Sequence, residues 1–153
     1  MRIAGVTLLC TLVLTASGGT AARADDKADV EKELKKLQGT WTFESVEVGG
    51  KEAPVADFKG MTVSFESGKF TVKKGDEVIQ VGTEKLDPSK SPKTVDLTVA
   101  EGLNKGAVML GIYEISGETL KVCFDPEGKK RPTEFKSASG SQTFVNVHKR
   151  VKK

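Results

Sequence analysis

The chain has 153 residues, with 24 Lys and Arg residues against 21 Asp and Glu residues and a net charge of +3. Arg2 and Arg23 fall in a leader that we expect to be removed, which lowers the net charge to +1 and argues against a nucleic-acid-binding protein. With one His and two Cys, the chain has too few of these residues for a His/Cys metal site, and no motif indicates a cofactor.

The first 24 residues have the features of a secretory signal peptide. Arg2 provides a positive start, and residues 3–16 form an apolar run that is too short for a membrane span. Ala22 and Ala24 have the small-x-small spacing that signal peptidase accepts. We therefore expect cleavage after Ala24 and export to the periplasm or the extracellular space, with an uncleaved anchor as the alternative. The mature chain, residues 25–153, is expected to be one domain without a transmembrane segment.

Residues 25–38 are predicted to form one helix. Val30, Leu34 and Leu37 recur at helical spacing and make one narrow apolar stripe. Acidic residues at the start and lysines near the end both suit the helix macrodipole. Gly39 stands where a left-handed C-terminal cap is needed. The stripe is too narrow to be stable alone, so the helix must lie on the rest of the domain.

After Gly39 the apolar period changes from helical to two, which is typical of strands. Trp41 and Phe43 share one face, and the phase slips near Ser45, which indicates a β-bulge. Two glycines at 49–50 indicate a hairpin. Further strands are expected at 61–66, 70–72, 78–81, 94–99, 107–115, 120–124, 133–135 and 142–150. About eight to ten strands with turn signals every 8–12 residues indicate an all-β sandwich or barrel.

The position of Trp41, the only Trp of the chain, indicates how such a barrel closes. A helix ending at Gly39 delivers Trp41 to the first inward position of the first strand, where its ring can plug the narrow end. In a closed meander the last strand pairs with the first, which brings Arg150 towards Trp41. A guanidinium over an indole face is a favourable cation–π pair.

Gly39, Trp41 and Arg150, together with the helix and the antiparallel meander, resemble the lipocalin-like superfamily. More closely, the chain is similar to a family of small secreted, functionally uncharacterised domains abundant in planctomycete-type bacteria. The matching stretches, in order, are "LQGTWTFESVEVGGKEAP", "LDPSKSPKTVDLT", "GIYEISGETLKVCF", "RPTEF" and "HKR". The resemblance implies an exported lipocalin-like β-barrel of about eight strands. It implies no activity, cofactor or ligand, so these three residues are a structural signature and no catalytic residue is assigned.

The remaining reactive side chains are expected to be structural. Cys10 leaves with the leader, so Cys123 remains without a disulfide partner. Its setting between Val122 and Phe124 predicts a buried, slow-reacting thiol. Its position in the alternation, on the same strand face as Lys121 and Asp125, argues for an exposed one. His148 neighbours basic residues near the C-terminus, and we expect it at the surface or at a strand end.

Three functions are consistent with these observations, and the fold alone does not choose among them. The first is a non-catalytic binding protein that holds a small apolar ligand in the barrel. The second is an envelope or extracellular protein-interaction module with a barrel filled by side chains, whose partner would be an envelope component. Under either function we expect a monomer. An enzyme is a remote third, because no catalytic constellation is visible. The large side chains expected inside favour a filled barrel or a shallow pocket: Trp41, Phe43, Met61, Phe65, Phe70 and Phe124. A cavity of roughly 300 Å³ or more would favour the first function.

Overall fold

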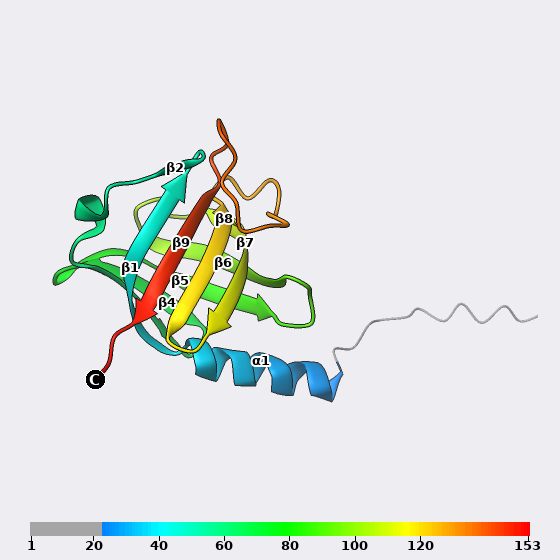
Figure 1. Cartoon of the computed structure of the whole chain (residues 1–153). Helices are drawn as coiled ribbons and strands as arrows, with labels where there is room; N and C mark the ends of the chain where they lie inside the picture. The colour runs from blue at the N-terminus through cyan, green and yellow to red at the C-terminus, as the bar shows by residue number, and fades with distance from the viewer. Residues whose placement is uncertain (1–22) are drawn as a thin grey trace, which may run out of the picture.

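The computed structural model describes residues 23–153, so the predicted signal peptide, residues 1–24, lies outside the described residues except for its last two positions. Residues 23–153 form one α-helix followed by a closed antiparallel β-barrel (Figure 1). The helix is α1 (Ala24–Leu37). The strands are β1 (Gly39–Val48), β2 (Lys51–Glu52), β3 (Met61–Glu66), β4 (Lys69–Lys74), β5 (Glu77–Asp87), β6 (Lys93–Gly102), β7 (Val108–Ser116), β8 (Thr119–Asp125) and β9 (Phe144–Arg150). A 3₁₀ turn, η1 (Val55–Phe58), connects β2 to β3.

The barrel is a meander that closes on itself. Each strand from β3 to β9 pairs with its sequence neighbour, β1 pairs with β3, and β9 returns to pair with β1. Eight strands therefore form the closed barrel, and β2 is a short extension paired with the end of β1. This arrangement confirms the predicted all-β meander barrel with a short N-terminal helix.

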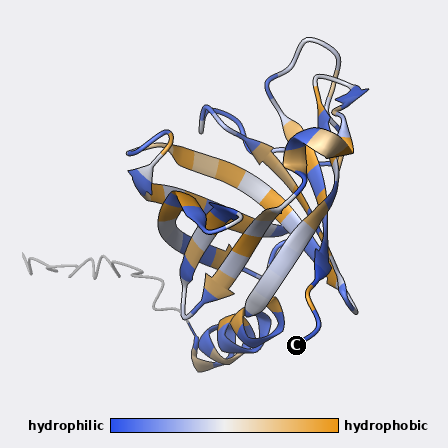
Figure 2. Ribbon diagram, turned by 90° about the vertical axis from the view of Figure 1, so that its left-hand side faces the viewer, coloured by the Kyte–Doolittle hydropathy of each residue, from blue (hydrophilic) through white to orange (hydrophobic). Residues whose placement is uncertain are grey.

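The sequence pattern of β1 produces its geometry. Trp41 is fully buried, and the register of β1 against β9 shifts between Phe43 and Ser45, where the bulge was predicted. The shift brings Val46, which is on the other parity, into a buried position. Similar alternation of apolar and polar residues runs along the other strands (Figure 2). Positive φ angles of 59° at Gly49 and 76° at Gly50 allow the tight turn from β1 into β2.

The two ends of the barrel differ. Helix α1 lies across one end, and the long connection between β8 and β9, residues 126–143, stands at the opposite end (Figure 1). We call the first the closed end and the second the open end. Leu37, in the last turn of α1, is buried in the main core with Trp41 and Leu120. Among residues 23–153, no helix has the length and apolar character needed to cross a membrane.

The short strand predicted at 133–135 is wrong, because these residues form bends within the 126–143 connection. This connection instead covers part of the outside of the barrel. Phe135 packs there against a second core of Ile112, Cys123 and Val145, which lies outside the main core. Residues from neighbouring strands thus bury apolar side chains on both faces of this part of the sheet, as the nearly continuous apolar run at 107–115 predicts.

Candidate functional site

The barrel holds a cavity of about 260 Å³ with a predominantly apolar wall. It extends from Leu37 under the helix to Leu103 in the connection between β6 and β7. Leu103 is 64% exposed, so the cavity reaches the surface at the open end. Five phenylalanines line the cavity: Phe43, Phe65, Phe70, Phe124 and Phe144. Trp41 lies outside the cavity wall, at the closed end of the main core.

Two glycines explain how a barrel with so many aromatic residues keeps an open centre. Phe70 and Gly82 are paired across β4 and β5, and Phe124 and Gly111 are paired across β7 and β8. A Cβ atom at Gly82 would lie 2.6 Å from the Phe70 ring, and one at Gly111 would lie 2.3 Å from the Phe124 ring. Each ring therefore occupies the space beside a glycine where a side chain would otherwise stand, which leaves more of the barrel centre free.

Two polar side chains of β9 lie in this apolar wall without hydrogen-bond partners. Asn146 is 9% exposed and His148 is 3% exposed, and both line the cavity. The Oδ1 atom of Asn146 and the Nδ1 atom of His148 are buried and make no hydrogen bond. Phe43 contacts the imidazole edge-on, with ring centroids 4.4 Å apart. Burial lowers the pKa of His148 to about 4, so its side chain is neutral at pH 7.

The expectation that His148 lies at the surface or at a strand end is wrong. Its cross-strand partner on β1 is Phe43, and the partner of Arg150 is Trp41. Because residues two apart on a strand share a face, the predicted contact of Arg150 with Trp41 already implied that His148 faces inward beside Phe43. His148 was instead expected at the surface because basic residues follow it in the sequence.

Three other polar side chains line the cavity: Tyr113 and Gln80 have partners, and Asn104 is exposed at the open end. Tyr113 donates a hydrogen bond to Glu33 Oε2 at 3.1 Å, and the Gln80 amide donates to the Leu103 carbonyl at 2.6 Å. No Asp, Glu, Lys or Arg lines the cavity within the part of the chain that the structure describes. The cavity is therefore uncharged at neutral pH, and its unmet hydrogen-bonding capacity is concentrated on β9.

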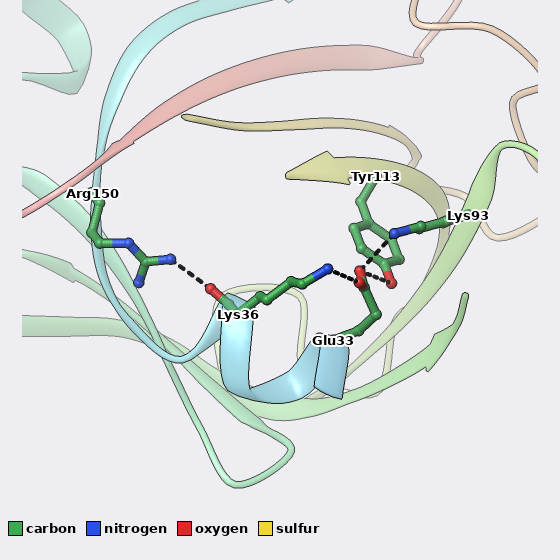
Figure 3. A network of polar contacts seen from close by, with 5 residues as sticks. All are labelled: Glu33, Lys36, Lys93, Tyr113 and Arg150. Carbon is green, nitrogen blue, oxygen red and sulfur yellow. Dashed lines mark hydrogen bonds and ion pairs between the residues drawn. The ribbon is translucent and has the colours of Figure 1, made fainter. Parts of the chain in front are cut away.

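At the closed end, a buried ion-pair network attaches α1 to the barrel (Figure 3). Glu33 is only 4% exposed and lies 2.8 Å from the Lys36 ammonium and 3.0 Å from the Lys93 ammonium. Burial raises the pKa of Glu33, but hydrogen bonds from Lys36, Lys93 and Tyr113 outweigh it and hold the pKa below its ordinary value. The helical stripe did not predict this buried carboxylate, because Glu33 lies beside the apolar positions.

The predicted contact between Arg150 and Trp41 is present. The guanidinium carbon lies 4.1 Å from the indole centroid. Arg150 also donates hydrogen bonds to the carbonyls of Gln38 at 2.7 Å and Lys36 at 2.5 Å, and the Trp41 indole donates to the Leu37 carbonyl at 2.8 Å. These are carbonyls that the end of an α-helix leaves without intrahelical partners. The signature of Gly39, Trp41 and Arg150 thus caps the C-terminus of α1.

Gly39 is needed at this position for two reasons. Its φ angle is +124°, a conformation that side-chain-bearing residues rarely adopt, and a Cβ atom there would lie 3.1 Å from Arg150 Nη1. The turn from α1 into β1 therefore depends on a residue without a side chain. The predicted role of Gly39 at the helix end is consistent with this geometry.

Glu84 is a second inner carboxyl that sequence reasoning missed. It pairs with Leu97 across β5 and β6, and its Oε2 atom is buried without a hydrogen bond. Burial raises the pKa of Glu84 to about 8. Glu84 is therefore largely protonated and neutral at pH 7. It does not line the cavity described above.

Cys123 is fully buried, as predicted, and its thiol is free. It lies in the outer core under Phe135, on the opposite face of β8 from Val122 and Phe124. The alternation along β8 therefore gave the correct direction for the Cys123 side chain, which faces the outside of the barrel. It is buried because the 126–143 connection covers this part of the outer face. Burial raises the pKa of Cys123, which disfavours the reactive thiolate.

No family model matches the chain, and no curated protein matches it in sequence. The lipocalin-like resemblance therefore stays a prediction from the quoted motifs, whereas the closed barrel is a property of the structure. Within residues 23–153, no three His, Cys, Asp or Glu side chains gather as a metal site requires. The cavity, with the two polar residues on β9, is the site that these observations favour.

Proposed function

We propose that the protein is a non-catalytic binding protein that holds one small apolar molecule inside its barrel. The observation that carries this proposal is the 260 Å³ apolar cavity that reaches the surface at the open end. Eight-stranded barrels are just wide enough either to fill with side chains or to hold one small ligand. Here the Phe70–Gly82 and Phe124–Gly111 pairs keep the aromatic rings on the wall and support the second use.

The volume sets the size of the ligand. At about 260 Å³ it lies just below the roughly 300 Å³ that was expected for this function, so the proposal rests on the apolar wall and the opening to the surface more than on volume. At about 30 Å³ for each water-sized group, the cavity has room for about nine non-hydrogen atoms. A ligand of this size favours a small aromatic or short-chain compound over a lipid with full-length acyl chains.

A cavity-filling variant tests the proposal. Val72 lines the cavity and is half-buried, whereas Val78 is 50% exposed and lies outside it. We expect Val72→Phe to weaken binding of 4-ethyltoluene at least tenfold in isothermal titration calorimetry. Val78→Phe, the matched control, should leave binding unchanged. Native mass spectrometry of protein purified from its own host should also show a retained small molecule.

If 4-ethyltoluene and 4-ethylphenol both fail to bind and nothing is retained, the proposal fails. The interaction module with a filled barrel would then be the better interpretation. An enzyme would require a reacting group. The neutral His148 and the buried Cys123 face opposite sides of the sheet, so they do not form a nucleophile–base pair with each other.

We further propose that the protein is exported and acts as a monomer in the periplasm or outside the cell. The signal-peptide pattern of residues 1–24 supports this proposal. The expected result of N-terminal sequencing of the mature protein is a chain that begins at Asp25. A mature chain that begins at Met1 would remove the export proposal without affecting the cavity.

A further inference from the structure

We infer that the ligand carries a neutral hydroxyl group, and that Asn146 and His148 recognise this group inside the barrel. The inference rests on the proposed ligand-binding function and specifies the chemistry of the ligand. It assigns a specificity-determining role to two side chains that otherwise leave buried polar atoms without partners.

The first step is that both unpaired atoms belong to side chains that line the same cavity from one face of β9. Asn146 and His148 are two residues apart on β9, and both line the cavity. Residues with this spacing lie on the same strand face and about 6.8 Å apart along the strand. A ligand held against this face of β9 therefore lies beside both side chains.

The second step is that leaving these atoms unpaired is costly. A buried polar atom without a hydrogen bond destabilises a fold, and most buried polar groups in proteins have a partner. Apolar residues at both positions would fill the same space at no such cost. The unpaired atoms are explained if a ligand supplies the missing hydrogen bonds.

The third step concerns the chemistry of the head group. Asn146 presents a carbonyl oxygen, which accepts a hydrogen bond, and a neutral imidazole carries one donor and one acceptor nitrogen. A hydroxyl group is both a donor and an acceptor, so it can serve either side chain. A methyl group in its place would leave both atoms unpaired.

The fourth step excludes charged head groups. The described residues place no Lys or Arg in the cavity wall to stabilise a carboxylate, and no Asp or Glu to stabilise an ammonium. The burial that keeps His148 neutral would also penalise a charged ligand. The ligand class is therefore a small alcohol or phenol.

The test uses four probes of similar size and one assay. We would measure the affinity of 4-ethylphenol, 4-ethyltoluene, 4-methylbenzoate and 4-methylbenzylamine at pH 7 by isothermal titration calorimetry. The neutral phenol is expected to bind at least tenfold more tightly than the hydrocarbon and than either charged compound. A site built around a hydrogen bond discriminates strongly against an analogue that lacks the group.

Three variants assign the preference to β9. Asn146→Leu and His148→Phe, which keep the side-chain size, should each weaken phenol binding about tenfold, as expected for one lost buried hydrogen bond, and should not weaken hydrocarbon binding. Lys149→Leu is the control, because Lys149 lies on the same strand but its side chain is 60% exposed and outside the cavity. It should leave the ratio of the two affinities unchanged.

A further readout separates recognition from a structural role. Without ligand, Asn146→Leu should raise the melting temperature, because it removes an unpaired buried oxygen. A structural asparagine would instead give a destabilised variant. The wild-type probe series decides the question even if a variant does not fold.

Each outcome has a defined meaning. Equal affinity for the phenol and the hydrocarbon overturns the hydroxyl inference but leaves the proposed apolar-binding function intact. Tighter binding of the benzoate or the amine overturns the neutral head group. Failure of all four probes to bind overturns both the inference and the proposed function.

Discussion

Replacing Arg150 with Met is expected to cost about 2–4 kcal/mol of unfolding free energy. The guanidinium lies 4.1 Å from the Trp41 ring centroid and donates hydrogen bonds to two carbonyls at the end of α1. A desolvated cation–π pair contributes about 2 kcal/mol, and a hydrogen bond from a charged donor contributes about 1.5–3 kcal/mol. The side chain is 24% exposed, so the expected loss lies well below the sum of these full contributions. The ion pair with Glu118 at 3.5 Å adds little, because it is exposed.

The measurement is equilibrium denaturation, followed by fluorescence because Trp41 is the only Trp and by circular dichroism where Trp41 is changed. Lys149→Met is the matched control, because Lys149 directly precedes Arg150 and its side chain is 60% exposed. This substitution should change the free energy of unfolding by less than about 0.5 kcal/mol. Arg150→Lys keeps the charge, but a single ammonium cannot stack on the ring and bridge two carbonyls, so it should recover less than half of the loss.

A double-mutant cycle with Trp41→Phe tests the contact itself. We expect a coupling free energy of about 1–2 kcal/mol between positions 41 and 150, because the two groups touch. Losses that add within about 0.3–0.5 kcal/mol would refute the reasoning. The cap on α1 would then owe its stability to burial of Leu37 and Trp41 rather than to the stacked guanidinium.

Three further predictions concern titratable side chains. Burial lowers the pKa of folded His148 to about 4, so between pH 6.5 and pH 4 the side chain gains a proton in the unfolded protein but not in the folded one. The free energy of unfolding, measured by denaturation at a series of pH values, should therefore fall by up to about 3 kcal/mol as the pH falls through this range. His148→Phe should remove this pH dependence. Glu84 should give the opposite pH dependence, because burial raises its pKa in the folded protein to about 8. The free energy of unfolding should fall by up to about 5 kcal/mol as the pH rises from 4.5 to 8. A Glu84→Gln variant with the same pH dependence would contradict this. Cys123 should react with a thiol reagent about a hundredfold more slowly in the folded than in the unfolded protein, and Phe135→Ala should accelerate the reaction; rapid labelling of the wild type would show that the outer core is open.

The sequence predicted the barrel because its signals are local and repeated. Alternation along each strand, the phase slip before Ser45 and the glycines at 49–50 each depend on near neighbours, and the structure contains the bulge and the turn that they predict. To predict the contact of Arg150 with Trp41, one non-local assumption was needed, namely that the meander closes. The structure contains this closure as the pairing of β1 with β9.

The site was harder to predict because it depends on register between distant strands. His148 and Asn146 face inward only because β9 pairs with β1 in a particular register, while Val145 on the other parity is covered by Phe135. Apolar alternation on β9 alone would place Val145 and Val147 inside. A connection that packs on the outer face of the sheet thus reverses the usual inference from alternation.

The size of the cavity was also not visible in composition. Counting aromatic residues predicted a filled barrel or a shallow pocket, and the cavity of about 260 Å³ stays below the roughly 300 Å³ of a typical ligand pocket. The cross-strand partners Gly82 and Gly111 have no side chain, so the rings of Phe70 and Phe124 occupy the wall. Composition gives the volume of the side chains, whereas pairing decides where that volume lies.

The polar groups that fix α1 on the barrel have partners, whereas two side chains of the cavity wall and the inner carboxyl Glu84 leave atoms unpaired. Beneath α1, Glu33, Trp41 and Arg150 all have partners, and their hydrogen bonds fix the helix on the barrel. In the cavity wall, Asn146 and His148 leave atoms unpaired, although leucine or phenylalanine would fit the same strand positions. Natural proteins depart from local consistency mainly where function requires it. The polar contacts of the capped end therefore supply stability, whereas the unpaired atoms on β9 carry a cost that the proposed recognition of a ligand hydroxyl would explain.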